Sequence, residues 1–593
     1  MKILKRLFLS LLAIVLLSAA WFAWYNLRSH DPKELIAALP STITSKYDTS
    51  DDWWKSTTVY QIYPRSYYDS DGDGIGDLRG IIQKLDYIDS VGFETIWISP
   101  FFESPLKDHG YDIANYREIG SEYGDMDMVD SLIAEVHRRD MKIVFDMVLN
   151  HTSDQHPWFL ESKSSKDNPK SDWYVWSDGK NDGPPNNWTN IVGQESGWNY
   201  SEERDQWYYA AFLPFQPDLN MRNPEVKAAI FDMVRFWLDK DVDGFRLDIF
   251  NFIFEDEQLR DNPSTARYLP DFDNRKWLFR NHLYNFHQPE VVEFARELRE
   301  VLESYPKEKF MVGEVLGSHR HMRELQGMES HDGLNLVFLF DILEGFEFSA
   351  DFFHGKLSDF EAAYPKPLVP TYVFGNHDQH RMISRLDNDP KKHEVLATFQ
   401  YTVRGVPFTY MGEEIGTRNG DISLAEAQDP LASYWLELPE WMQKSSFIFN
   451  RDNCRTPMQW SSGAHAGFTT GPETWLPVEK HYKETNVADA MADPNSLLQH
   501  YREVIQLRKE HEALQTGDLE LIAKGDLPEN VLGYIRRSSD EQLLVLLNFS
   551  EQDVTVDTGK FDLHSEPLYA RRALKEGNGL VLRGNGIAIY SLP

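Results

Sequence analysis

Residues 244–249 read GFRLDI, a short apolar run that ends in charged and branched residues. In the preceding segment Val226, Ile230, Val234 and Leu238 recur every four residues, which predicts a helix with one apolar face. Seven other β-rich runs alternate with amphipathic segments: VYQIYPR from Val59, TIWISP from Thr95, KIVFDMV from Lys142, KFMVGEV from Lys309, LNLVFLFD from Leu334, PTYVFGNHD from Pro370 and PFTYMGEEIG from Pro407. Eight such units predict an α/β fold, a (β/α)8 TIM barrel.

Two segments depart from this alternation. Residues 152–214, between the third and fourth runs, are rich in Asp, Asn, Gly, Pro and Trp, which predicts an inserted subdomain. After a helix expected at about 495–511, alternating segments such as LLVLLNFS from Leu543 predict a C-terminal antiparallel β domain over 516–593. The remaining boundaries are expected to be a leader at 1–29, a spacer at 30–52, and the two barrel parts at 53–151 and 215–515.

The N-terminus has the charge pattern of an export segment. Basic residues precede an uncharged apolar run from Leu7 to Tyr25. The tripeptide SAA at 18–20 resembles a signal-peptidase site, whereas the length of the run also suits a membrane anchor. Both a cleaved signal and a retained anchor remain open. In either case the positive-inside rule places the bulk of the chain outside the cytoplasm.

The overall charge limits the class of partner. The chain has 60 basic and 94 acidic residues, a net charge of -34, which disfavours binding to nucleic acid or to an anionic membrane surface. A neutral substrate is unaffected by this field. The single cysteine, Cys454, excludes an internal disulfide.

Three of the predicted strands end in a carboxylate. Asp248 ends GFRLD, Glu314 ends FMVGE and Asp378 ends FGNHD. One such residue alone is explained equally well as a helix cap. Three together, in a barrel whose catalytic groups lie at the carboxyl ends of strands, indicate a site. Further polar residues at comparable positions are Arg246, His151 and His377.

These motifs resemble glycoside hydrolase family 13 and, within it, the oligo-1,6-glucosidase and α-glucosidase group. The resemblance runs from about Asp52 to the C-terminus. Its motifs stand in the family's order: DMVLNH at 146–151, QPDLN at 216–220, GFRLD at 244–248, VGEV at 312–315, GNHD at 375–378 and RDNCRTPMQW from Arg451.

The resemblance implies a retaining glycosidase with Asp248 as nucleophile and Glu314 as acid/base. Cleaving an acetal this way needs a carboxylate that attacks and a carboxylic acid that protonates the leaving oxygen, about 5 to 5.5 Å apart. Arg246 is expected to keep the nucleophile ionised, and an enclosed site should raise the pKa of Glu314.

The other polar residues are expected to bind the sugar. Asp378 would complete the catalytic trio by hydrogen-bonding to hydroxyl groups, with His151 and His377 as further donors.

Exo-action is implied by KDHGYD, where Asp108 and Tyr111 match family residues that close the non-reducing end of the pocket. Arg455 resembles the arginine that pairs with that aspartate. Tyr111 is expected to stack on the sugar ring, and Phe212 to form a second wall. A closed pocket admits one terminal sugar, which predicts an α-glucosidase acting on short α-1,4 or α-1,6 linked oligosaccharides. Ile249 resembles the valine of α-1,6 enzymes more than the smaller residues of α-1,4 enzymes, which favours α-1,6 activity.

The segment DSDGDGIGD at 69–77 resembles the calcium loop after the first strand in this group. The implied ligands of Ca²⁺ are Asp69, Asp71, Asp73, Asp77 and the carbonyl oxygen of Ile75. A hard cation prefers such oxygen ligands, and its role would be structural. An acidic turn without an ion is the alternative.

Other functions stay open. The same glycosyl intermediate can pass to a sugar, as in a transglucosidase or a sucrose or trehalose isomerase, because the acceptor site is built from loops. Departures from the family at Asn115 and His380 weaken the substrate assignment rather than the mechanism. A non-catalytic, membrane-anchored transporter partner is disfavoured by the intact carboxylate trio. An endo-acting α-amylase is disfavoured by the expected pair of Asp108 and Arg455.

Overall fold

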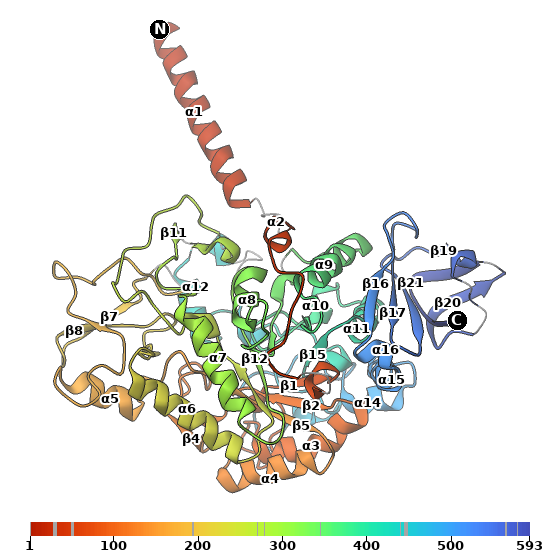
Figure 1. Cartoon of the computed structure of the whole chain (residues 1–593), viewed down its shortest axis with the longest axis horizontal. Coiled ribbons are helices and arrows are strands. Elements are labelled where there is room, and N and C mark those ends of the chain that lie inside the picture. The colour runs from red at the N-terminus through yellow and green to blue at the C-terminus, as the bar shows by residue number, and fades with distance from the viewer. Residues whose placement is uncertain are drawn as a thin grey trace.

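The computed structural model describes most of the chain (Figure 1). It describes residues 2–27, 33–48, 52–191, 195–269, 271–277, 279–343, 345–438, 440–443, 449–561, 563, 566–577 and 579–593, without the side chains of 2–14, 34–35 and 441–442.

Eight parallel strands form the centre of the molecule. They are β1 (Val59–Ile62), β2 (Thr95–Ile98), β5 (Lys142–Met147), β9 (Gly244–Leu247), β12 (Phe310–Gly313), β13 (Leu336–Val337), β14 (Thr371–Val373) and β15 (Val406–Tyr410). Their hydrogen-bonded order is β13-β12-β9-β5-β2-β1-β15-β14. The Thr371 hydroxyl bridges the two ends of this order, because it accepts from Leu339 N at 3.0 Å and donates to Val337 O at 2.9 Å. The predicted TIM barrel is confirmed.

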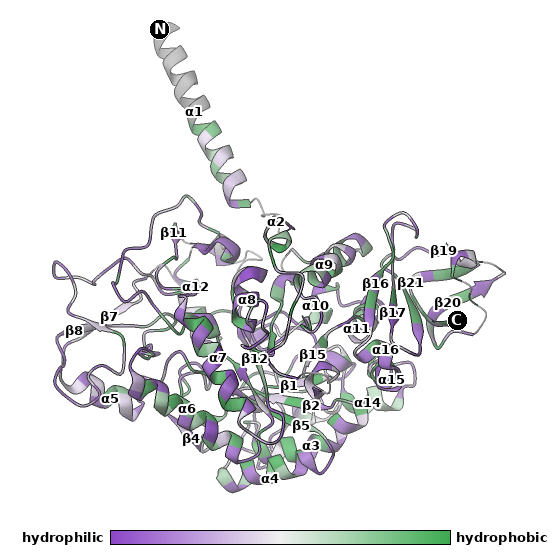
Figure 2. Ribbon diagram, in the orientation of Figure 1, coloured by the Kyte–Doolittle hydropathy of each residue, from purple (hydrophilic) through white to green (hydrophobic). Residues whose placement is uncertain are grey.

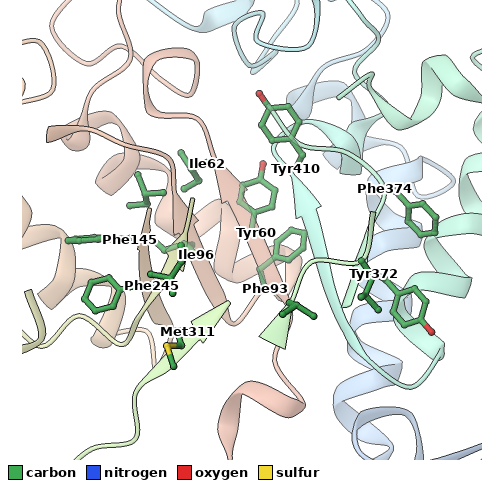
Figure 3. Packing of buried hydrophobic residues seen from close by; sticks show 14 of the residues in the cluster. Tyr60, Ile62, Phe93, Ile96, Phe145, Phe245, Met311, Tyr372, Phe374 and Tyr410 are labelled. Carbon is green, nitrogen blue, oxygen red and sulfur yellow. The ribbon is translucent and has the colours of Figure 1, made fainter. Parts of the chain in front are cut away.

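The strands alternate between two cores, because successive side chains of a strand point to opposite faces. Val59, Trp97, Val144, Phe310 and Phe408 belong to one buried cluster inside the barrel. The residues that follow or precede them along the strands, among them Tyr60, Ile96, Phe145 and Met311 in Figure 3, pack outward against the helices. The same alternation makes Asp146, Arg246 and Glu314 face inward.

Helices cover the barrel. The main ones are α3 (Leu78–Val91), α4 (Met126–His137), α6 (Pro224–Asp239), α7 (Glu290–Glu303), α8 (His319–Gln326), α9 (Ala350–Ala363), α11 (Pro390–Thr402) and α15 (Leu497–Glu510). Helix α6 begins where Asn223 caps the N–H of Glu225 and Pro224 takes the first helical position. Its four predicted apolar residues are buried. Figure 2 shows the resulting mixture of hydrophobic and hydrophilic residues along α4 and α6.

The inserted subdomain follows β5. It contains α5 (Pro157–Ser164) and an antiparallel sheet of β6 (Trp176–Ser177), β8 (Gln206–Tyr209) and β7 (Trp198–Ser201). A second excursion, residues 250–289, leaves the barrel directly after β9 and carries the hairpin β10 (Lys276–Trp277) and β11 (Arg280–Asn281). Trp188 and Tyr209 of the subdomain share one buried cluster with Phe252 and Phe286 of this excursion. This second excursion falls within the segment 215–515 that the sequence predicts as the second barrel part.

The C-terminal domain is antiparallel, as predicted. Its strands are β16 (Asp518–Leu521), β17 (Val531–Arg537), β18 (Gln542–Asn548), β19 (Val554–Asp557), β20 (Tyr569–Glu576) and β21 (Gly579–Leu592). It lies beside α11 and α15 in Figure 1. Tyr534 and Arg536 of β17 bond to Thr402 at the end of α11, at 2.5 and 2.6 Å.

The N-terminal segment forms α1 (Lys2–Leu27), which projects from the body of the molecule, and the short α2 (Lys33–Ala37) (Figure 1). The apolar run from Leu7 to Tyr25 lies partly outside the residues with described side chains. Among the residues whose side chains are described, no helix is both long and apolar enough to cross a membrane.

Candidate active site

One arginine joins three carboxylates at the ends of three adjacent strands. Arg246 Nη1 donates to Asp146 Oδ1 at 2.9 Å and to Asp248 Oδ1 at 2.6 Å. Its Nη2 donates to Glu314 Oε2. The Arg246 side chain is 1% exposed, so this charge cluster is shielded from water. The geometry therefore places Asp248 and Glu314 on the two terminal nitrogens of one rigid guanidinium group.

The pKa values of these carboxylates are raised toward neutrality. Burial raises the pKa of Asp248 to about 7, although the Arg246 charge lowers it. Burial likewise raises the pKa of Glu314 to about 7, against the same arginine. Because the two groups share Arg246 and repel each other when both are ionised, they titrate as a pair. Such a pair can hold one proton near neutral pH, which gives one acid and one carboxylate.

Asp378, in contrast, is held in its ionised form because nearby positive charges outweigh its burial. Its Oδ1 accepts from Arg451 Nη1 at 3.0 Å and from Arg455 Nη2 at 2.7 Å. Its Oδ2 lies 3.1 Å from His377 Nε2. Burial works to raise the pKa of Asp378, but His377 and the two arginines hold it well below its usual range. Asp378 is therefore an anionic acceptor close enough to Asp248 and Glu314 to act on their charges.

His377 is an uncharged residue packed between two tyrosine rings. Its ring lies between those of Tyr63 and Tyr111, with centroids 5.7 and 5.3 Å away. Gln61 Nε2 is 2.8 Å from Nδ1, and the Tyr111 hydroxyl is 2.7 Å from Nε2. Burial lowers the pKa of His377 to about 3. The Tyr111 hydroxyl also donates to Asp146 Oδ2 at 3.0 Å, so the tyrosine ring has a fixed orientation.

His151 and Phe212 lie where the inserted subdomain meets the barrel. His151 Nε2 is 3.2 Å from the Tyr111 carbonyl oxygen, and burial lowers the pKa of His151 to about 4. The Phe212 ring lies 5.8 Å from the His151 ring and 5.1 Å from that of Phe252. Phe212 thus contacts both the barrel and the second excursion.

The predicted pairing of Arg455 with Asp108 is wrong. Asp108 instead accepts from Arg451 Nη2 at 3.0 Å and from Gln216 Nε2 at 3.1 Å. Arg451 begins a 3₁₀ helix, and its guanidinium group forms ion pairs with both Asp108 and Asp378. Arg455 comes after that turn and lies deeper, where its Nε donates to the His377 carbonyl oxygen at 2.8 Å.

The site residues that the sequence did not predict include Asp146, Gln216, Asp429 and Arg451. Three of them begin motifs that had been recognised, DMVLNH, QPDLN and RDNCRTPMQW. Asp429 lies in a loop without a motif. It binds Arg451 twice, accepting from Nε at 2.8 Å and from Nη2 at 2.7 Å.

The acidic loop 69–77 brings three of its carboxylates together. Oxygen atoms of Asp69, Asp71 and Asp77 lie within 4.8 Å of one another. Asp73 turns its Oδ1 toward the N–H of Ile75, at 2.8 Å. Asp69 and Asp77 are buried. Three converging carboxylates with two of them buried fit a hard divalent cation.

A parallel eight-stranded barrel with a paired aspartate and glutamate, one able to stay protonated, is the arrangement that a glycosidase needs. A family model described as the α-amylase catalytic domain matches residues 61–517. The chain belongs to the α-amylase family of glycoside hydrolases, as its motifs predicted.

Proteins similar to this chain carry the names of different activities. The chain is 40% identical over 550 residues to an oligo-1,6-glucosidase of Parageobacillus thermoglucosidasius, covering 89% of this chain and 94% of that one. A crystal structure of the α-glucosyl transfer enzyme XgtA is 35% identical with a TM-score of 0.82, covering 91% and 99% of the two chains. A trehalulose synthase structure is 32% identical with a TM-score of 0.83, covering 91% and 100%.

Proposed function

We propose that this glycoside hydrolase is an exo-acting, retaining α-glucosidase that releases glucose from the non-reducing end of short α-1,4 or α-1,6 linked oligosaccharides. One observation carries the proposal. Arg451 bridges Asp108 and Asp378, and this bridge stands beside the Asp248–Arg246–Glu314 cluster. We infer that this charged bridge closes one end of the site, so that a terminal sugar binds and a chain that continues does not.

The geometry supports a double displacement. Glu314 gives its proton to the glycosidic oxygen while the Asp248 carboxylate attacks the anomeric carbon, so that the bond to the leaving sugar breaks. Glu314, now ionised, then takes a proton from water, and the resulting hydroxide attacks the same carbon. Glucose leaves with its configuration retained, Asp248 is freed, and Glu314 is again protonated.

Asp378 accepts hydrogen bonds from sugar hydroxyl groups in this scheme. Its low pKa keeps it ionised, and charge-assisted hydrogen bonds to the distorted ring strengthen as positive charge develops. Neutral His377 is held by Gln61 at Nδ1, which leaves the proton on Nε2, where the Tyr111 hydroxyl and Asp378 Oδ2 lie 2.7 and 3.1 Å away.

The pH dependence follows from the pair of carboxylates. Asp248 must be ionised, so activity falls as pH drops through its pKa. Glu314 must be protonated, so activity falls as pH rises through its pKa. With both values at about 7, kcat/KM is expected to follow a bell centred near neutrality. Glu314→Gln, assayed with an aryl glucoside whose leaving group needs no proton, should lose the alkaline limb. An alkaline limb unchanged in that variant would contradict the assignment.

Ile249 bears on the linkage. It follows the nucleophile with a left-handed backbone, φ 37°, and its N–H lies 3.4 Å from Glu314 Oε2. A β-branched residue in that conformation is strained, so the surrounding contacts must hold it there. Its side chain is buried in the cluster shared by the subdomain and the second excursion, beside the acid/base.

We expect glucose release from isomaltose to be faster than from maltose. Ile249→Thr should shift the ratio of the two kcat/KM values toward maltose by roughly tenfold, since the change removes apolar contact at the acceptor side. The measurement is product analysis with maltose, isomaltose and sucrose. Isomaltose hydrolysis no faster than maltose hydrolysis would refute the α-1,6 preference.

Glucosyl transfer is the second candidate function. The structures of the α-glucosyl transfer enzyme and the trehalulose synthase favour it, since their barrels resemble this one closely. An isomeric disaccharide formed from sucrose, in place of free glucose and fructose, would favour this candidate over hydrolysis.

We propose further that the 69–77 loop holds Ca²⁺ through Asp69, Asp71 and Asp77. The ion would neutralise three close carboxylates and fix the loop that leads into α3, whose first turn Asp77 caps.

Removing Ca²⁺ with EDTA is therefore expected to lower Tm by roughly 3–5 °C, and added Ca²⁺ should restore it. Differential scanning calorimetry checks this. Asp71→Asn, which alters an exposed carboxylate, should abolish the response to Ca²⁺ while leaving kcat/KM at 25 °C unchanged. Identical Tm values with EDTA and with Ca²⁺ would show that the loop is an acidic turn only.

A further inference from the structure

A cavity lined mainly by basic residues lies next to the loops that follow Asp248 and Glu314. Its volume is about 710 Å³, and it is formed by the second excursion, 250–289, and by the neighbouring helices α7 and α8 (Figure 1). We call this cavity the α8 pocket. In a chain with a net charge of -34, its lining has three arginines and two histidines but only one carboxylate: Arg260, Arg275, Arg320, His287, His321 and Glu324.

The walls of the α8 pocket support both loops that carry the paired carboxylates. His287 N donates to Asn251 O at 2.8 Å, and Asn251 follows Asp248 by three residues. The Asn251 side chain donates in turn to Leu316 O at 2.6 Å, two residues after Glu314. The pocket is therefore separate from the candidate active site but is connected to it through one layer of loop.

Two of the three arginines already have carboxylate partners. Arg260 donates to Asp256 through Nε and Nη2, and Arg320 Nε donates to Glu324 Oε1 at 2.9 Å. Glu324 Oε2 lies 3.0 Å from His287 Nε2. Burial works to raise the pKa of Glu324, but the bonds to His287 and Arg320 lower it to about 2. Both oxygens of this ionised carboxylate are therefore in use.

Arg275 is the arginine without a carboxylate. Among the residues that the structure describes, its guanidinium group makes a single hydrogen bond, from Nη1 to the Phe286 carbonyl oxygen at 3.5 Å. Its side chain is half-buried, and burial lowers the pKa of Arg275 because a charge held away from water is costly. An anion placed beside the unused N–H groups would offset this cost.

His321 offers a second unused donor. Ser318 N donates to His321 Nδ1 at 3.2 Å, so this nitrogen has no proton. Burial lowers the pKa of His321 to about 3, so the ring is neutral and carries its one proton on Nε2. The described part of the chain provides no acceptor for that proton. Arg275 and His321 therefore bring one charged and one neutral donor to the same cavity.

Phosphate is the anion that suits this lining. Arg320 uses only Nε for Glu324, so its two terminal nitrogens remain at the rim, where 59% of its side chain is exposed. Guanidinium groups bind phosphate oxygens in pairs, and the oxygens of one phosphate can be shared among several donors. The apolar side chains of Leu283, Tyr284 and Val292 line the remainder of the pocket, which suits a small organic group attached to the phosphate.

We propose that the α8 pocket binds phosphate, either as inorganic phosphate or as the phosphate group of a small ester. Arg275 and His321 are the inner ligands, and Arg260 and Arg320 stand at the rim. The bound anion balances the charge of Arg275 and ties the second excursion to α8. Phosphate binding here is independent of the glucosidase reaction.

The first test titrates inorganic phosphate into the full chain in detergent by isothermal calorimetry, at constant ionic strength. One phosphate is expected to bind per chain. Arg275→Gln should raise Kd roughly tenfold or more, since it removes a charge-assisted hydrogen bond. Arg280→Gln removes the same charge from the same excursion, outside the pocket, and should leave Kd unchanged. No binding to the unsubstituted protein, or equal Kd values in all three proteins, overturns the proposal.

Arg320→Gln is a second variant, chosen because its exposed side chain can change without disturbing the fold. It should raise Kd by roughly threefold, less than Arg275→Gln, because water screens a charge at the rim. Cooperative thermal unfolding shows that each variant folds. If Arg275→Gln does not fold, an unchanged Kd in Arg320→Gln overturns the proposal.

Competition separates the α8 pocket from the active site. Glucose, which is expected to bind beside Asp248 and Glu314, should not displace phosphate, and displacement by glucose would place the phosphate in the active site and overturn the proposal. The two sources of phosphate are compared with glycerol 3-phosphate, a small ester without a sugar ring. A lower Kd for the ester than for inorganic phosphate assigns the pocket to an ester, and a higher Kd assigns it to the free ion.

Discussion

Asp248→Asn is expected to lower kcat by on the order of 10⁴-fold or more, because an amide cannot form the glycosyl intermediate. That loss corresponds to about 5 kcal/mol of transition-state stabilisation. The substitution keeps the shape of the side chain, and Arg246 keeps its bonds to Asp146 and Glu314, so the fold should survive. The measurement is glucose release from isomaltose, with thermal unfolding to verify folding.

Asp232→Asn is the matched control for that experiment. Asp232 lies on α6 with 70% of its side chain exposed and pairs with Arg117, so its loss should change kcat by less than about twofold. A second variant, Asp248→Gly, should regain activity with azide and yield the β-glucosyl azide, because azide attacks from the vacated face. Substantial activity in Asp248→Asn, or an α-configured azide product, would rule out Asp248 as the nucleophile.

Arg451→Lys is expected to lower kcat/KM by roughly 10²- to 10³-fold, with much of the loss in KM. Arg451 binds Asp108, Asp378 and Asp429 through one planar guanidinium group. A lysine keeps the positive charge, but its single ammonium group cannot hydrogen-bond to all three carboxylates in this geometry. The pocket should also open at its closed end, so products longer than glucose should appear from maltoheptaose.

Two comparisons make the Arg451 result specific. Arg117→Lys, a half-exposed arginine of a surface pair, should leave both constants unchanged. Asp429→Asn should show the same pattern as Arg451→Lys with a smaller loss, roughly tenfold, because Asp429 acts only by orienting the guanidinium. An Arg451→Lys enzyme with unchanged KM and glucose as its sole product would contradict the closed pocket.

The alternation of residues along each strand was enough to predict the barrel and the side chains that point into it. Alternation along GFRLD makes Arg246 and Asp248 share a face, and the same period in KFMVGE makes Glu314 meet them. This works because a strand offers two faces, and an apolar neighbour at every second position shows which face is buried. The strand ends could therefore be identified from the sequence, together with the carboxylates that stand on them.

Only the tertiary structure decided which partners meet. Arg451 and Arg455 occur in one short motif, yet they have different partners. Arg451 binds Asp108, which is 343 residues away in the sequence, whereas Arg455 donates to the carbonyl oxygen of His377. Asp429 and the contacts of Asn26 with the backbone of Ala266, Tyr268 and Leu269 have no sequence signal, since each depends on where a long loop returns. A repeating pattern reports burial within one element, whereas a salt bridge between loops depends on the path of every element that separates them.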